Sequence, residues 1–213
     1  MFQGNLRDDT VRIYICGPHS TGKTTLLNDL RPYLGNIKVV EEVARDIIKS
    51  HGWARKDFHP EKHPDIFQQL NAEILAAQIE TDVKYTSMRQ DFICDRALDP
   101  IIYCGFYIDE RAKEAMYELD GIDQWFESLR KSLVILVSPH LECIRDDTVR
   151  LTSSLEELQE FYVKFEEELQ RNNIKYMKLA QLDRQERVNI VLNEINIFRL
   201  GKSLTDVGSN IVV

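Results

Sequence analysis

Five short apolar runs recur along the chain, and stretches with helical periodicity separate them. The first run combines β-branched and aromatic residues, which is typical of a buried strand. The five runs are VRIYIC (11–16), IKVVEE (37–42), DFICDR (91–96), SLVILVSP (132–139) and IKYMKLA (174–180). The stretches with helical spacing lie at about 23–34, 43–52, 64–86, 98–106, 110–130, 155–171 and 184–197.

This alternation of strands and helices predicts an α/β fold, with a five-stranded parallel sheet that has helices on both faces. No internal repeat or flexible linker interrupts it, so we expect a single domain over 1–213 with its core at 11–197. The last residues, 198–213, lack periodicity and form either a docked or a mobile tail. Ligands of such folds bind at the carboxyl ends of the strands, which are therefore the places to search for chemistry.

The first strand leads into the segment ICGPHSTGKTTL (15–26), which contains the pattern G-x-x-x-x-G-K-[ST] without a mismatch. A glycine allows the sharp turn out of the strand, and a second one lets the backbone approach phosphate oxygens. The following helix directs its positive end at the anion. We expect Lys23 to reach the β and γ phosphates and the Thr24 hydroxyl to ligate Mg²⁺. The predicted nucleotide-binding residues are Gly17, Pro18, His19, Ser20, Thr21, Gly22, Lys23, Thr24 and Thr25.

The third apolar run ends in FICDRALDPIIY, which places Asp95 at the end of a buried strand. Beside a phosphate-binding loop, such a carboxylate is suited to hold Mg²⁺, directly or through water, or to accept a proton from a hydroxyl. Arg96 would then supply compensating charge or reach a phosphate. A purely structural carboxylate paired with Arg96 is the alternative.

The second run ends in VVEEVARDII, where Glu42 and Arg45 lie three residues apart. A helix that begins there would present both side chains on one face, where they could bind the hydroxyls and an anionic group of a substrate. The alternative is a helix-terminal glutamate with a surface ion pair. Either Glu42 or Asp95 could be the base of a transfer reaction.

The fourth run leads into the charged segment PHLECIRDDTVRLTSS. We expect 141–153 to form a lid, in which Arg145 contacts substrate and Arg150 closes over the nucleotide to stabilise transferring charge. An exposed charged loop is the alternative. Ser154 and Glu157 have the spacing of a capping box at the start of the next helix.

Composition narrows the function further. The net charge of −8 argues against a long nucleic-acid groove, although a local basic patch is compatible with it. No apolar run is long enough to span a bilayer and the first residues contain no signal-peptide core, so we expect a protein of the cytosol, with the nucleus not excluded. The four cysteines form no C-x-x-C pair, and the histidines of segment 50–64 suggest a solvated loop more than a metal site.

In its order of motifs the chain resembles the P-loop small-molecule kinases. The resemblance is greater to the AAA-type ATPase-like domains related to the bacterial ribosylnicotinamide kinase domain, and it covers about 11–197. It implies a P-loop NTPase three-layer sandwich, with Asp95, Asp99, Glu42 and Arg45 around the substrate and Mg²⁺ at Thr24 and Asp95. The motifs that carry it are GPHSTGKTT, EEVAR, CDRALDPIIY, IRDDTVRL and LDRQERV.

The leading hypothesis is therefore ATP- and Mg²⁺-dependent phosphoryl transfer to a small-molecule acceptor. Arg96 follows Asp95 where the bacterial kinase has threonine, a difference more typical of nucleoside and nucleotide kinases, so nucleosides, nucleotides and vitamin ribosides remain open as acceptors. The alternative hypothesis is a nucleotide-binding switch or ATPase module that controls a partner protein. A 5′-polynucleotide kinase is disfavoured by the acidic charge.

Overall fold

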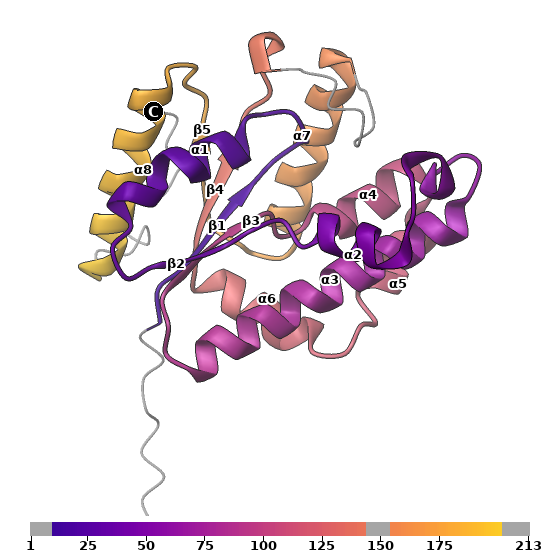
Figure 1. The fold of residues 1–213 in the computed structure, drawn as a ribbon, viewed down its shortest axis with the longest axis horizontal. Helices are drawn as coiled ribbons and strands as arrows, with labels where there is room; N and C mark the ends of the chain where they lie inside the picture. The colour runs from indigo at the N-terminus through magenta and orange to yellow at the C-terminus, as the bar shows by residue number, and fades with distance from the viewer. Residues whose placement is uncertain (1–9, 144–153, 202–213) are drawn as a thin grey trace, which may run out of the picture.

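The computed structural model describes residues 10–143 and 154–201, and their strands form a single parallel sheet in the order β2-β3-β1-β4-β5 (Figure 1). The register aligns Ile13 of β1 with Ile93 of β3 and with Leu133 of β4. Five parallel strands confirm the α/β fold that the alternating pattern predicts. The strands are β1 (Arg12–Cys16), β2 (Lys38–Val40), β3 (Phe92–Asp95), β4 (Leu133–Val137) and β5 (Tyr176–Leu179).

Helices cover both faces of this sheet, as Figure 1 shows. Helices α1 and α8 lie on one face, and α3, α4, α6 and α7 lie on the other. The helices are α1 (Lys23–Leu30), α2 (Ala44–His51), α3 (Pro64–Ser87), α4 (Asp99–Tyr107), α5 (Glu110–Met116), α6 (Ile122–Arg130), α7 (Leu155–Arg171) and α8 (Arg184–Arg199). Three 3₁₀ turns are η1 (Arg31–Tyr33), η2 (Arg55–Phe58) and η3 (Leu141–Cys143).

The alternation of side chains along β1 explains the two layers. Ile13 and Ile15 pack against α1 and α8, whereas Tyr14 and Cys16 pack against the helices of the opposite face. All four side chains are buried because a central parallel strand is covered on both sides. This double burial is the reason that VRIYIC is apolar throughout.

Two of the expected helices have different bounds in the structure. The stretch 110–130 is not one helix but two, α5 and α6, because the chain turns between them and Gly121 adopts a left-handed backbone with φ of 81°. The stretch 23–34 is helical only to Leu30, after which Pro32 lies in the 3₁₀ turn η1. Apolar periodicity continues through both breaks, so periodicity alone does not reveal them.

A smaller apolar cluster lies beyond the edge of the sheet, between α2, η2 and the first half of α3. Its buried members are Phe58, Phe67, Leu70 and Ile74, and side chains of α2 pack against them. These elements form one wall of a pocket at the carboxyl ends of β2 and β3. In the part of the chain that the structure describes, no helix has both the length and the apolarity to cross a bilayer.

Candidate functional site

The loop between β1 and α1 has the backbone conformation that its glycines predict. Gly17 has φ of 133°, and a Cβ there would lie 2.6 Å from the backbone oxygen of Val137 on β4. Gly22 has φ of 81° and precedes the first residue of α1. A side chain at Gly17 would therefore collide with the neighbouring strand, in a backbone region that L-residues rarely occupy. Sequence and structure agree on a tight loop at the start of a helix.

Lys23 folds back over this loop. Its Nζ donates to the carbonyl oxygens of Gly17 at 2.6 Å and of Pro18 at 2.5 Å, and the side chain is buried. The Thr21 hydroxyl donates to the Pro18 oxygen at 2.9 Å. These bonds hold an ammonium group at the loop where a phosphate would approach, so the charge is positioned in advance.

Arg187 on α8 braces the loop from the other side, a role that the sequence analysis missed. Its Nη1 donates to the backbone oxygen of Thr21 at 3.2 Å, and its Nε donates to that of Gln181 at 2.6 Å. The side chain is buried. Arg187 therefore connects the phosphate loop to the segment that follows β5. The motif LDRQERV contains this arginine, but nothing in its sequence identifies the partner.

The two predicted magnesium ligands are in direct contact. The Thr24 hydroxyl donates to Asp95 Oδ2 at 2.7 Å, across 71 residues of sequence. Asp95 is 5% exposed, and its Oδ1 has no hydrogen-bond partner among the described residues. A buried carboxylate oxygen without a partner carries a free-energy cost that a bound cation would remove. The pair therefore fits Mg²⁺, which takes one or two protein oxygens together with phosphates and water.

Arg96, the next residue, pairs with two other carboxylates. Its Nη1 donates to Asp99 Oδ1 at 2.7 Å, and its Nε forms an ion pair with Glu42 Oε1 at 2.9 Å. Asp99 Oδ2 also accepts from the Ala97 amide at 3.1 Å. Arg96 therefore supplies charge compensation to the pocket, and the alternative of a simple Asp95–Arg96 pair finds no support in these contacts.

The position of Arg96 is strained and strongly charged. Its backbone φ is 88°, a region that costs a non-glycine residue about 1–3 kcal/mol and that recurs at functional sites. Burial by itself lowers the pKa of Arg96, but the charges of Glu42 and Asp99 outweigh it, and the pKa is raised above its ordinary value. The guanidinium therefore stays charged between two carboxylates.

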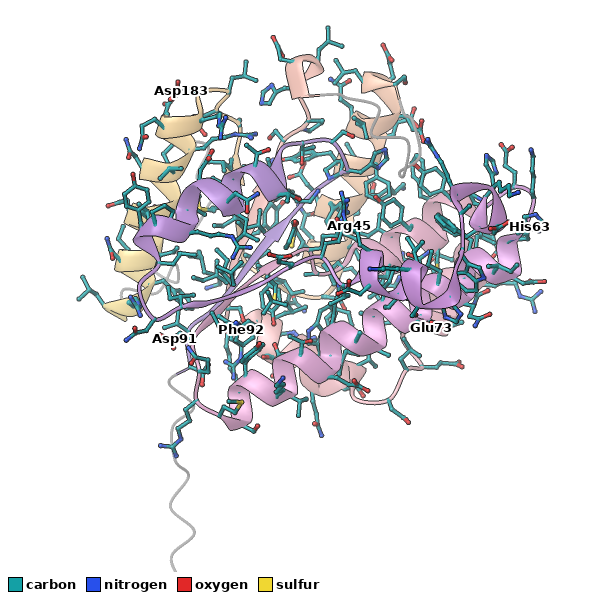
Figure 2. The ribbon with its side chains drawn as sticks, viewed as in Figure 1. Arg45, His63, Glu73, Asp91, Phe92 and Asp183 are labelled. Carbon is teal, nitrogen blue, oxygen red and sulfur yellow. The ribbon has the colours of Figure 1, made fainter. Side chains whose placement is uncertain are left out.

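Glu42 and Arg45 do not share a helix face as expected, because α2 begins only at Ala44. They are still close, with Arg45 Nε 3.7 Å from Glu42 Oε2. Their exposures differ: the Glu42 side chain is 12% exposed and the Arg45 side chain 56%. In the view of Figure 2, Arg45 lies at the end of α2 that is nearer the sheet. Glu42 is thus part of the pocket interior, and Arg45 lies at its rim.

An open pocket with a cavity volume of about 100 Å³ adjoins these charges. One end has the polar groups Glu42, Arg96, Asp99 and His19, whereas the other is predominantly apolar. Motifs at strand ends predict the polar end but not the apolar one, which comes from α2, η2 and α3. The residues of the apolar part are Ala44, Ile48, Phe58, Phe67, Leu70, Asn71, Ile74, Pro100 and Tyr103.

His19 connects the phosphate loop to this pocket. Its Nδ1 lies 3.1 Å from Tyr103 Oη, and the two rings stack with centroids 6.2 Å apart. Burial raises the pKa of Tyr103 to about 12, so its hydroxyl keeps its proton at neutral pH and can donate to His19. His19 therefore contacts the acceptor side of the site as well as the nucleotide side.

The remaining expectations concern the lid arginines, the start of α7 and the histidines of segment 50–64. Arg145 and Arg150, with most of the expected lid, lie outside the described residues. Ser154 caps α7 as expected, because its side chain accepts from the Glu157 amide. His51 pairs with Glu73 at 2.6 Å and stacks on Trp53, and in Figure 2 His63 lies at the end of α3 that is remote from the sheet. Within 10–143 and 154–201 no group of potential metal ligands includes these histidines.

Comparisons with known proteins support this description. A family model described as an AAA domain matches residues 12–187. Curated proteins give no match. Among solved structures, a NadR protein in complex with NR superposes with a TM-score of 0.67 at 18% identity, over 88% of this chain and 52% of that one. The chain thus spans about half the length of the NadR structures that it matches.

Two other solved structures superpose on this chain over nearly their whole length. Deoxyadenosine kinase from M. mycoides with bound dATP has a TM-score of 0.60 at 16% identity, covering 87% of this chain and 99% of its own. Shikimate kinase from Aquifex aeolicus has a TM-score of 0.52 at 19% identity, covering 90% and 99%. At such identities the likeness establishes the fold.

Proposed function

The chain belongs to the AAA domain family, and from this premise we propose that it transfers a phosphoryl group from ATP to a hydroxyl of a small metabolite. The observation that carries the proposal is the bond between Thr24 and Asp95. It joins the phosphate loop to the end of β3, directly beside a pocket that contains a second carboxylate, Glu42. A phosphate donor and a hydroxyl acceptor could therefore bind next to each other.

The position of each residue determines the role that we assign to it in the transfer. The loop amides and Lys23 bind the phosphates, and Thr24 with Asp95 would hold Mg²⁺, which when bound neutralises phosphate charge. Asp95 Oδ2 already accepts from Thr24, so Asp95 is committed to the metal side of the site. Glu42 is the carboxylate on the acceptor side, and we assign to it the orientation and deprotonation of the hydroxyl.

The structural comparisons support a nucleoside, nucleotide or vitamin riboside as the acceptor. The NadR structure contains NR and the deoxyadenosine kinase structure contains dATP, and both are similar to this chain over 87–88% of its length. The pocket has a matching division into a charged end for hydroxyls and an apolar, aromatic end for a planar ring. Arg45 at the rim would serve an anionic group, and Arg145 and Arg150 of the lid would close the site.

Acceptor-dependent ATP consumption tests the proposal. Wild type and Lys23→Ala would be assayed with Mg²⁺ and a panel of nucleosides, nucleotides and vitamin ribosides, with ADP and phosphorylated acceptor both quantified. We expect one acceptor class to raise ADP formation well above the acceptor-free rate in wild type only. Slow ADP formation that no acceptor changes would reject the kinase and favour the nucleotide-dependent switch.

A further inference from the structure

The apolar wall of the acceptor pocket contains a buried amide, the side chain of Asn71 on α3. Asn71 is 3% exposed and occurs on the helix face that also presents Phe67, Leu70 and Ile74 to the pocket. Burying a polar side chain among apolar ones costs free energy unless its hydrogen-bonding groups are satisfied. An asparagine at this point of the stripe therefore requires a partner for each end of its amide.

Only one end of this amide has a partner among the residues that the structure describes. Asn71 Nδ2 donates to the backbone oxygen of Phe67 at 2.8 Å. The Oδ1 atom receives no hydrogen bond from any residue in the described ranges, and Asn71 is one of the residues that line the pocket. A carbonyl oxygen can only accept, so the Phe67 backbone fixes which way the amide points. Of the two polar atoms, Oδ1 is the one without a partner in the described part of the chain, so at this point of the pocket wall Asn71 can accept a hydrogen bond from a ligand.

We propose that Asn71 is a specificity residue that selects acceptors whose planar ring carries an exocyclic N–H donor, an amino or carboxamide group. The inference rests on the proposed function for the identity of the pocket. Phe58, Phe67 and Tyr103 supply aromatic surface for a planar ring, and Asn71 Oδ1 adds one directional contact. A ring with an oxo or carboxylate oxygen at that point would place lone pairs against Oδ1 and leave two buried oxygens unpartnered.

Binding of matched acceptor pairs tests this selection. Nicotinamide riboside with nicotinic acid riboside exchanges a carboxamide N–H donor for an oxygen acceptor. Adenosine with inosine and cytidine with uridine exchange an exocyclic amino group for an oxo group and also gain a hydrogen on the adjacent ring nitrogen, so in these pairs the comparison concerns the exocyclic group. Dissociation constants would be measured by calorimetry, with Mg²⁺ and a non-hydrolysable ATP analogue present. In at least one pair we expect the N–H member to bind about 10- to 100-fold more tightly, the range for one buried polar contact made or lost.

Two variants separate this contact from the rest of α3. Asn71→Leu removes both polar atoms at similar volume, and the Phe67 carbonyl keeps its helical hydrogen bond, so no backbone group loses its partner. We expect the ratio within the pair to fall to about twofold or less, with the affinity for the ATP analogue unchanged. Gln69→Leu makes the same kind of change on the exposed face of α3, where Gln69 bonds to Glu73, and should leave the ratio as in wild type.

The outcomes distinguish this inference from the proposed function. Equal or tighter binding of the oxygen members, a ratio retained in Asn71→Leu, or no binding of any pair would overturn the role of Asn71. If the N–H preference is present in wild type and lost in Asn71→Leu, the assignment of Asn71 holds even where no phosphoryl transfer is detected. That last combination would reject only the kinase reaction.

Discussion

Replacing Asp95 with asparagine should make the ligand-free protein more stable and the nucleotide complex weaker. Asp95 is buried with one oxygen bonded to Thr24 and the other without a partner. A buried polar atom without a partner costs about 1–3 kcal/mol, and more when the group is charged. Asparagine keeps the oxygen that accepts from Thr24 and places an uncharged NH2 group where Oδ1 has no partner, so a polar group without a partner remains but the buried charge is removed. We therefore expect the free energy of unfolding without ligand to rise by about 1 kcal/mol.

The same change should reduce the stabilisation that Mg²⁺ and ATP confer. A ligand at about 100 times its dissociation constant stabilises the folded state by about 2.7 kcal/mol. If the amide weakens binding tenfold, the gain at the same ligand concentration falls to about 1.4 kcal/mol. Urea unfolding of wild type and Asp95→Asn, with and without Mg²⁺ and a non-hydrolysable ATP analogue, measures both effects. With a chelator in place of Mg²⁺, the two proteins should respond equally to the analogue.

Asp99→Asn is the matched control, because it makes the same chemical change at a carboxylate with both oxygens bonded. Asp99 accepts from Arg96 and from the Ala97 amide, so its replacement should destabilise the ligand-free protein by about 2 kcal/mol. The two variants are thus expected to differ in sign. An Asp95→Asn protein that is less stable than wild type and fully stabilised by Mg²⁺ and analogue would refute the assignment of the metal site.

Three further changes test the loop and the core. Lys23→Ala should lower kcat at least about a hundredfold with the fold intact, measured by steady-state kinetics and circular dichroism, because its charge is positioned for the phosphates. Gly17→Ala should lower the free energy of unfolding, measured with urea, by at least about 3 kcal/mol, because the new Cβ would lie 2.6 Å from Val137 O. Gly52→Ala, at a position with φ of 67° and no atom near the new Cβ, should lower it by about 1 kcal/mol. Burial raises the pKa of Cys104 to about 12. Unfolding returns the thiol to its ordinary pKa, so the free energy of unfolding should fall by up to about 1.4 kcal/mol per pH unit between about pH 9 and 12. Cys104→Ala should make this slope less steep.

Each of these predictions has a contradicting result. A folded Lys23→Ala protein with near-normal turnover would remove the catalytic role of the loop. Equal losses in Gly17→Ala and Gly52→Ala would show that the approach to β4 is unimportant. An unchanged slope of stability against pH in Cys104→Ala would mean that this thiol does not change its pKa on folding.

The sequence determined the parts of the protein that depend on local periodicity and local backbone chemistry. The apolar runs and helical spacings predict the five strands and most helices, because both patterns repeat over a few residues. The pattern from Gly17 to Thr24 predicts the loop conformation, since φ at Gly17 and Gly22 follows from what only glycine tolerates. The helix breaks at Gly121 and after Leu30 were not predicted, because the apolar spacing continues across them.

Only the tertiary structure decided which of these residues meet. The order β2-β3-β1-β4-β5 sets the end of β3 beside the loop after β1, so that Thr24 reaches Asp95. Arg187 reaches Thr21 across 166 residues, a pairing that no local pattern encodes. Asn71 had a local signal, because it is a polar residue within an apolar helical stripe. Whether its Oδ1 has a hydrogen-bond partner, however, depends on how α3 packs beside the pocket. Strand order and helix packing follow from the burial of the whole chain, and for that reason they were beyond any short-range pattern.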